Sequence, residues 1–181
     1  MVSSREFPER PIVGVGGVVI DSGRALLIRR ASEPLRGEWS IPGGMLELGE
    51  TLEEGVVREL QEETGLHVRI IELIEVFDRI VYPQMSSPRE TDRETEPVVP
   101  PLPADAQSSG STQARLPSPR YHYVIVDYLC EKISGNHAAA SDVTDVTFAR
   151  EDELERFHLT ETALRVLHKA FALYRARRSA G

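Results

Sequence analysis

The chain has 181 residues, with 21 Lys and Arg against 29 Asp and Glu, a net charge of −8 that disfavours nonspecific binding to duplex nucleic acid. This length suits one sizeable domain and is too short for two full ones, so we expect a single domain over 1–181 with a core of about 11–170. Cys130 is the only cysteine, which excludes a disulfide framework and a cysteine-based zinc site and predicts a buried thiol.

The chain begins with a polar segment that contains no apolar core of signal-peptide length. The longest apolar stretch, Ile12–Ile20, has nine residues counting its glycines, far fewer than a membrane span needs. A cytoplasmic location without a membrane partner is therefore expected.

Two runs of β-branched and aliphatic residues come next. Ile12–Asp21 and Arg24–Arg30 are separated by Ser22 and Gly23, a spacing that predicts a β-hairpin. The second run ends in Arg29 and Arg30. These two arginines either bind substrate phosphates or are ordinary surface charges.

A tryptophan and a glycine turn follow the predicted hairpin. Trp39 can stack on a base or close the core beneath the turn. Pro42, Gly43 and Gly44 allow the backbone to turn tightly. The turn either leaves its carbonyl groups available to nearby carboxylates or is an ordinary Pro-Gly turn.

A capped helix is predicted after the turn. Thr51 followed by Glu54 forms a capping box, so the helix starts near Leu52. Gly65 is the residue type that commonly follows a helix end. One apolar stripe recurs every four residues and should face a core: Leu52, Val56 and Leu60.

Three glutamates share one side of this helix. Glu59, Glu62 and Glu63 are spaced i, i+3 and i+4, which brings their carboxylates together beside the apolar stripe. Such a cluster repels itself unless a cation lies among the oxygens, and Mg²⁺ or Mn²⁺ suits an all-carboxylate site. The alternative is a solvated helix face. Arg58 either neutralises and orients the cluster or forms a surface pair with Glu54 or Glu62.

The segment Gly44–Leu66 resembles the Nudix box of the Nudix hydrolase family. Its spacing is Gly, five residues, Glu, seven residues, Arg-Glu, apolar, any, Glu-Glu, any, Gly, apolar, with fixed positions at Gly44, Glu50, Arg58, Glu59, Leu60, Glu62, Glu63, Gly65 and Leu66. RGEWSIPGG before the box and YHYVIVDYL after it resemble the bacterial ADP-ribose pyrophosphatase-like branch. The resemblance implies an α/β (α+β) fold, an α/β/α sandwich with a mixed β-sheet between helices.

The resemblance also implies a reaction, the Mg²⁺- or Mn²⁺-dependent hydrolysis of a phosphoanhydride in a nucleoside diphosphate linked to another group. ADP-ribose or a related nucleotide sugar is the favoured small-molecule substrate. Glu59 and Glu63 match the principal metal ligands and Glu62 a further one, with Glu50 and the carbonyl of Gly43 as weaker candidates. The candidate catalytic residues are Glu59, Glu62, Glu63 and Arg58, and the candidate substrate-binding residues are Arg29, Arg30, Trp39, Gly44 and Asp142.

Two other functions remain open. One is a nucleoside triphosphate pyrophosphohydrolase, including one that sanitises the nucleotide pool. The other is a non-catalytic Nudix ligand-binding module. Because many relatives are dimers, the resemblance also allows a homodimer.

The remainder of the chain contains further predicted strands and helices and one proline-rich insertion. Residues 83–120 hold eight of the twelve prolines and no aromatic residue, which predicts a disordered insertion or, alternatively, a lid. Asp142 and Asp145 precede or begin a short strand and are either the catalytic base or solvent-facing turn residues. The expected strands are Val68–Tyr82, Tyr121–Glu131 and Val143–Ala149, and the expected helices are Glu151–Phe157 and Glu161–Arg178.

Overall fold

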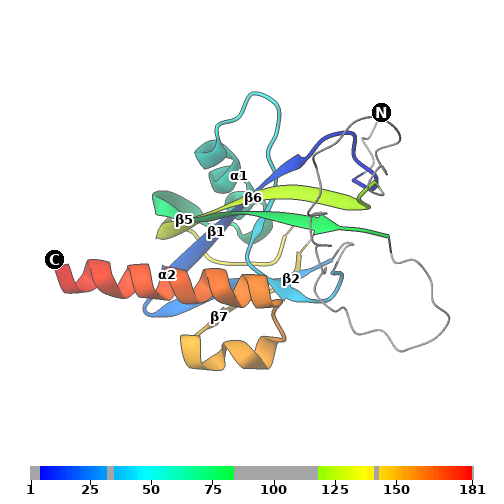
Figure 1. Ribbon diagram of the computed structural model, residues 1–181. Helices are drawn as coiled ribbons and strands as arrows, with labels where there is room; N and C mark the ends of the chain where they lie inside the picture. Colours follow the sequence, from blue (N-terminus) through cyan, green and yellow to red (C-terminus); the bar gives the residue numbers. More distant parts are fainter. Residues whose placement is uncertain (1–4, 32–34, 84–117, 141–142, 181) are drawn as a thin grey trace, which may run out of the picture. The chain divides into compact units, whose positions relative to one another are not determined.

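A computed structural model describes residues 5–31, 35–83, 118–140 and 143–180. Most of the predicted insertion at 83–120 lies outside the described residues and stays a prediction. The elements, in chain order, are β1 (Ile12–Asp21), β2 (Arg24–Arg30), β3 (Trp39–Ser40), β4 (Gly43–Met45), α1 (Leu52–Thr64), β5 (His67–Val81), β6 (Tyr121–Ser134), β7 (Val143–Ala149), the 3₁₀ helix η1 (Glu151–Phe157) and α2 (Glu161–Ala180) (Figure 1).

The predicted hairpin is confirmed residue by residue. β1 and β2 pair antiparallel, with Asp21 opposite Arg24. Ser22 and Gly23 both have positive φ, 51° and 75°, as a two-residue turn that follows the strand twist requires. β6 extends three residues beyond the predicted end at Glu131, and Glu151–Phe157 is a 3₁₀ helix. The short strands β3 and β4 were not predicted from the sequence. They are strands because β3 pairs with β2 and β4 pairs with β1, and their own residues carry no strand pattern.

The chain divides into two compact units, and the described residues of the smaller one are 5–12, 78–83 and 118–123. Here Arg120 and Glu6 form an ion pair of 2.8 Å, and the Tyr121 hydroxyl donates to Glu6 at 2.7 Å. The rings of Tyr121 and Tyr123 stack with centroids 6.2 Å apart, so these alternate residues of β6 share one face.

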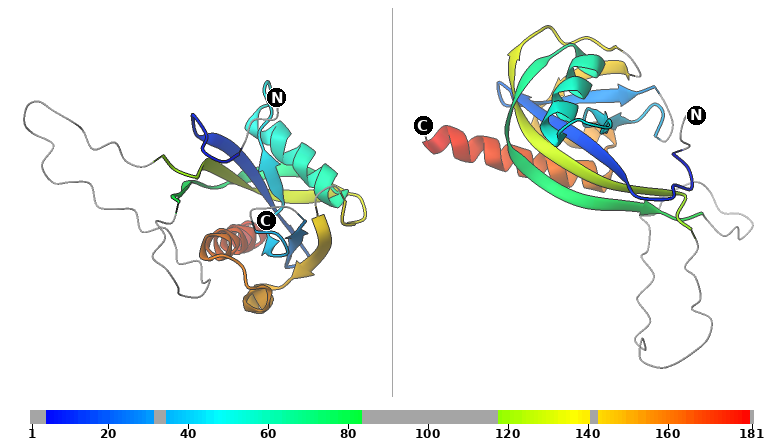
Figure 2. Two further views of the ribbon diagram at one scale, coloured as in Figure 1. Left: turned by 90° about the vertical axis from the view of Figure 1, so that its right-hand side faces the viewer. Right: turned by 90° about the horizontal axis from the view of Figure 1, so that it is seen from above.

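The larger unit, residues 13–77 and 124–181, carries a sheet with a helix on each face. Among the described residues the strand order is β3-β2-β1-β6-β5, with β4 paired to β1 and β7 to β2. Alternate residues of β1 enter two separate cores: Val15 and Val19 pack with α1, whereas Val18 and Ile20 pack with α2. The two helices therefore cover opposite faces of β1 (Figure 1), and the long strands β5 and β6 curve beside each other (Figure 2).

Helix α1 begins and ends as predicted. The Thr51 hydroxyl accepts from the Glu54 amide, and the Glu54 carboxylate accepts from the Thr51 amide at 2.8 Å. Gly65 ends the helix with φ at 71°, a left-handed conformation that glycine adopts at little cost. Val56 and Leu60 are fully buried and Leu52 packs against the same core, so the predicted stripe is confirmed.

The second core packs against one apolar stripe of α2. Leu167 and Phe171 are buried, and Leu164 and Tyr174 pack against the same cluster. On the α1 face, Cys130 is a buried free thiol, and burial raises its pKa to about 12. Among the described residues, no helix has the length and apolar character needed to cross a membrane.

Candidate active site

The glycine turn lies against β1. Strand β4 pairs with β1 so that Gly44 is opposite Val15 and Gly43 is opposite Gly16. A Cβ atom on Gly43 would lie 2.2 Å from the carbonyl oxygen of Val15, so the strands can approach this closely only because position 43 has no side chain. Helix α1 begins at Leu52, seven residues after β4 ends at Met45, and contacts β4.

The three clustered glutamates differ sharply in exposure. Glu63 is 3% exposed, and its Oε2 accepts a hydrogen bond of 2.8 Å from the Gly43 amide. The side chain of Glu59 is 14% exposed and that of Glu62 is 54% exposed. The exposure of these side chains therefore increases from Glu63 through Glu59 to Glu62. They do not form a uniformly solvated helix face.

Gly44 is required by the position of Glu59. A Cβ atom at position 44 would lie 2.3 Å from Oε1 and 2.6 Å from Oε2 of Glu59, far inside van der Waals contact. Any other residue would displace the carboxylate or the turn. The glycine turn and helix α1 thus pack closely on either side of the Glu59 carboxylate.

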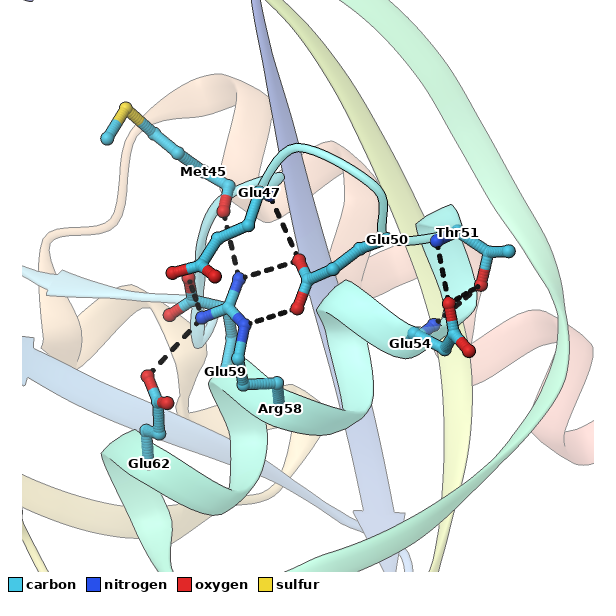
Figure 3. Close-up of polar contacts among 8 residues, drawn as sticks. All are labelled: Met45, Glu47, Glu50, Thr51, Glu54, Arg58, Glu59 and Glu62. Carbon is cyan, nitrogen blue, oxygen red and sulfur yellow. Dashed lines mark hydrogen bonds and ion pairs between the residues drawn. The ribbon is translucent and has the colours of Figure 1, made fainter. Parts of the chain in front are cut away.

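Arg58 joins three of the carboxylates (Figure 3). Its Nε donates to Glu50 at 2.6 Å and its Nη2 to the second oxygen of Glu50 at 3.0 Å. Its Nη1 donates to Glu59 at 2.8 Å and to Glu62 at 3.3 Å, and Nη2 also donates to the Met45 carbonyl at 3.0 Å. Glu54 is instead occupied by the capping box. The guanidinium therefore orients carboxylates, and its surface pair is limited to Glu62.

These contacts set the charge states of the group. The hydrogen bonds to Glu50, followed by those to Glu59, hold the pKa of Arg58 well above its ordinary value, although partial burial opposes them. The same bonds from Arg58, together with the Glu47 amide, hold the pKa of Glu50 below its usual range. Glu50 and Arg58 therefore remain an ion pair at neutral pH.

The fit to a metal ion depends on this arginine. Within the described ranges, no three His, Cys, Asp or Glu side chains gather closely enough to hold a metal ion as they stand. Arg58 lies between Glu50, Glu59 and Glu62 and neutralises part of their charge. The donor set is nevertheless all oxygen, which suits Mg²⁺ or Mn²⁺, and Glu62 is exposed enough to change rotamer.

A groove of about 1050 Å³ opens beside this cluster. Glu50, Arg58 and Glu62 line it on the α1 side, and Ile70 and Ile133 supply an apolar wall from β5 and β6. Charged groups and apolar surface thus meet next to the carboxylates.

Comparison with known proteins identifies the fold. The NUDIX domain family matches residues 10–169, nearly the whole chain. The chain belongs to the NUDIX family. Segment Gly44–Leu66 is therefore its Nudix box, and the predicted fold, an α/β/α sandwich with a mixed sheet, is confirmed.

Individual relatives agree with this assignment. An ADP-ribose pyrophosphatase of Methanocaldococcus jannaschii is 45% identical over 67 residues, 37% of this chain and 40% of that protein. A MutT-like protein of Streptomyces ambofaciens is 53% identical over 66 residues, 36% and 41% of the two chains. The matches thus span about 40% of these relatives' lengths. The crystal structure of a MutT NUDIX hydrolase from Burkholderia pseudomallei is 26% identical, covers 89% of this chain and 98% of its own, and has a TM-score of 0.63.

The candidate substrate-binding residues outside the Nudix box make separate contacts. Trp39 packs against the α2-side core, with its ring edge-on to Phe157 at 5.2 Å, so it helps to close the core, and stacking on a base stays a prediction. Arg29 donates through Nε to the Gly37 carbonyl at 2.7 Å. The Nε of Arg30 is buried and has no hydrogen-bond partner among the described residues, an arrangement that a bound anion would satisfy.

The two aspartates proposed as a base stay untested. Asp142 lies outside the described residues. Asp145 is exposed on β7, opposite Arg29, and accepts a hydrogen bond of 2.9 Å from the Val146 amide. The Asp145 side chain thus binds the backbone amide of the next residue, and both roles predicted for it stay predictions.

Sequence reasoning missed Asp127 on β6. It is 4% exposed, and burial raises its pKa to about 7, with a further contribution from Glu75. The available signal was an acidic residue inside the apolar run VIVDYLC, where charge is expensive to bury.

Proposed function

We propose that this protein hydrolyses a phosphoanhydride bond in a nucleoside diphosphate linked to another group, with ADP-ribose as the favoured substrate. The observation that carries the proposal is the fit of the glycine turn to the box glutamates. Glu63 is buried against the Gly43 amide, and Glu59 occupies the space that a side chain at Gly44 would fill. A buried and a partly buried carboxylate placed against one glycine turn are typical of a site built for a cation.

Glu59, Glu62 and Glu63 would hold a divalent cation, Mg²⁺ or Mn²⁺. When bound, such a cation neutralises phosphate oxygens and lowers the pKa of a water molecule. Arg58 fixes the orientation of Glu59 and Glu62, and Glu50 in turn fixes Arg58 through both of its oxygens. Glu50 is accordingly better suited to positioning Arg58 than to binding the cation.

The remaining polar groups are suited to binding an anionic substrate. The buried Nε of Arg30 offers an unused hydrogen bond to a phosphate oxygen. The groove lined by Glu50, Arg58 and Glu62 has room for a nucleotide-sized group beside the carboxylates. ADP-ribose is favoured because a relative named as an ADP-ribose pyrophosphatase is 45% identical over its matched segment.

The test is product analysis with purified protein and Mg²⁺ or Mn²⁺. ADP-ribose should give AMP and ribose 5-phosphate. A nucleoside triphosphate pyrophosphohydrolase would instead release a nucleoside monophosphate and pyrophosphate from a triphosphate. Tight binding of one nucleotide without turnover of any diphosphate or triphosphate would point to a ligand-binding module and would refute the enzyme assignment.

A further inference from the structure

A second pocket lies at the end of β1 that is remote from the glycine turn. It has a volume of about 320 Å³ and is lined by Asp21, Ser22, Arg24, Lys132, His137 and Phe148, none of which lines the groove beside the Nudix box. Asp21 ends β1 and lies five residues beyond Gly16, which pairs with the glycine turn. At about 3.3 Å per residue, the pocket is roughly 17 Å along the strand from that turn.

The lining side chains converge on the face of the sheet that α1 covers. Three residues of the α1-side core lie two positions away from lining residues on the same strands: Val19, Leu26 and Cys130. Because side chains alternate along a strand, Asp21, Arg24 and Lys132 face the same side. Phe148 reaches the pocket from β7 and packs against that core, so the pocket has an apolar wall beside its charged groups.

The positive charge of this pocket is only weakly neutralised. Arg24 is exposed and forms no ion pair among the described residues. The Nζ of Lys132 lies 4.0 Å from Oδ2 of Asp21, the outer limit of an ion pair, whereas Oδ1 accepts from the Ser22 hydroxyl at 3.1 Å. Two permanent cations and a histidine therefore share one carboxylate, in a chain whose net charge is −8.

The histidine is held in place by the loop 135–140. The Ala138 amide donates to the Thr64 carbonyl at 3.0 Å, and the Ala140 amide donates to the Glu63 carbonyl at 3.2 Å. The His137 ring lies edge-on to Phe148, with centroids 5.1 Å apart. These contacts place the imidazole in the pocket before any ligand binds, which lowers the entropic cost of binding.

The donors of this pocket match the oxygens of a phosphate group. Guanidinium, ammonium and imidazole groups all donate hydrogen bonds to phosphate, and the charged ones bind it most strongly. Because ligand pockets in proteins begin at about 300 Å³, this pocket is suited to a small ligand. We propose that it binds a phosphate group, either free or carried by a small phosphomonoester. This site is separate from the proposed function and does not depend on hydrolysis by the Nudix box.

The experiment is a nitrogen-15 NMR titration of the full chain with inorganic phosphate, ribose 5-phosphate and ribose, at fixed ionic strength. Divalent cations are omitted, because the Nudix-box carboxylates then repel phosphate. The backbone amides of Arg24, Lys132 and His137 should shift with both phosphates and not with ribose. Tighter binding of ribose 5-phosphate would identify a phosphomonoester as the ligand, and equal affinity would identify free phosphate.

Two charge-removing variants locate the site. Arg24→Gln and Lys132→Gln should each weaken phosphate binding by about tenfold or more, as expected for one charge-assisted hydrogen bond. Arg156→Gln is the matched control, because it also removes one exposed positive charge but lines neither pocket, and it should bind phosphate like the wild type.

Three results would overturn the inference. The first is equal affinity of the wild type, Arg24→Gln and Lys132→Gln for phosphate. The second is equal weakening by Arg156→Gln, which would show a general effect of net charge. The third is a set of shifts confined to the Nudix box and Arg30, which would place the phosphate in the candidate active site.

Discussion

Both carboxylate oxygens of Glu50 accept hydrogen bonds from Arg58, at 2.6 Å from Nε and 3.0 Å from Nη2. This two-point contact fixes the plane of the guanidinium, and the remaining Nη1 then meets Glu59 and Glu62. The orientation of Glu59 and Glu62 therefore depends on Glu50, a residue outside helix α1.

Replacing Arg58 by Lys should lower kcat by about 10- to 100-fold, because a lysine keeps the charge but cannot bind Glu50 and Glu59 in this planar arrangement. Steady-state hydrolysis of the substrate found by product analysis is the measurement. Arg150→Lys is the control, since Arg150 forms an exposed pair with Asp152 and does not line the groove. Equal rates for Arg58→Lys and the wild type would show that orientation by Arg58 is unimportant.

Neutralising a box carboxylate should remove activity without unfolding the protein. Glu63→Gln and Glu59→Gln keep the side-chain shape but remove the charge, and kcat should fall by about 100-fold or more. Mn²⁺ affinity, followed by electron paramagnetic resonance, should weaken in parallel. Glu161→Gln, on the first turn of α2 and outside the groove, should change neither quantity. Retained Mn²⁺ binding in both variants would place the cation elsewhere.

Adding one methyl group at position 44 should disturb Glu59 directly. Gly44→Ala would place Cβ 2.3 Å from the Glu59 carboxylate, which is the flexible end of its side chain and would have to move, so we expect a fall in kcat of at least about tenfold with little loss of stability. Gly14→Ala is the control on the paired strand, because its Cβ would meet its nearest neighbours at 3.6 Å, an ordinary contact. Thermal unfolding and steady-state kinetics are measured on both variants. A Gly44→Ala variant with wild-type kcat would show that Glu59 does not need the space beside Gly44.

Asp127 should make stability fall as pH rises. Burial, followed by Glu75, raises its pKa in the folded protein to about 7, against an ordinary 3.8, while Arg165 opposes the shift. The folded state therefore binds more protons than the unfolded state between these values, and the free energy of unfolding declines from about pH 4 to pH 7 by on the order of 3 kcal/mol from this group. Asp127→Asn should remove that decline.

Urea unfolding of the wild type and Asp127→Asn at pH 5 and pH 8 measures this effect. The difference between the two proteins isolates Asp127, because carboxyl groups with lowered pKa, such as Glu50 and Glu75, contribute the opposite slope to both. Parallel pH dependence in the two proteins would show that Asp127 does not titrate in the folded state.

Local patterns were sufficient for much of the fold. The capping box at Thr51, the stop at Gly65 and the hairpin at Ser22–Gly23 were all predicted from the sequence and are present. Each depends on backbone preferences and hydrogen bonds within a few residues, so no distant part of the chain is needed to specify it.

The sequence by itself determined the Nudix box, its capped helix and the side of that helix on which the glutamates lie. Only the tertiary structure decided what each of these residues contacts. The burial of Glu63, the contact of Arg58 with Glu50, and the position of Asp127 over Gly16 all depend on strands that pair across long stretches of chain. Spacing along the chain reports the periodicity of a helix or strand, whereas partners brought together by folding leave no local pattern.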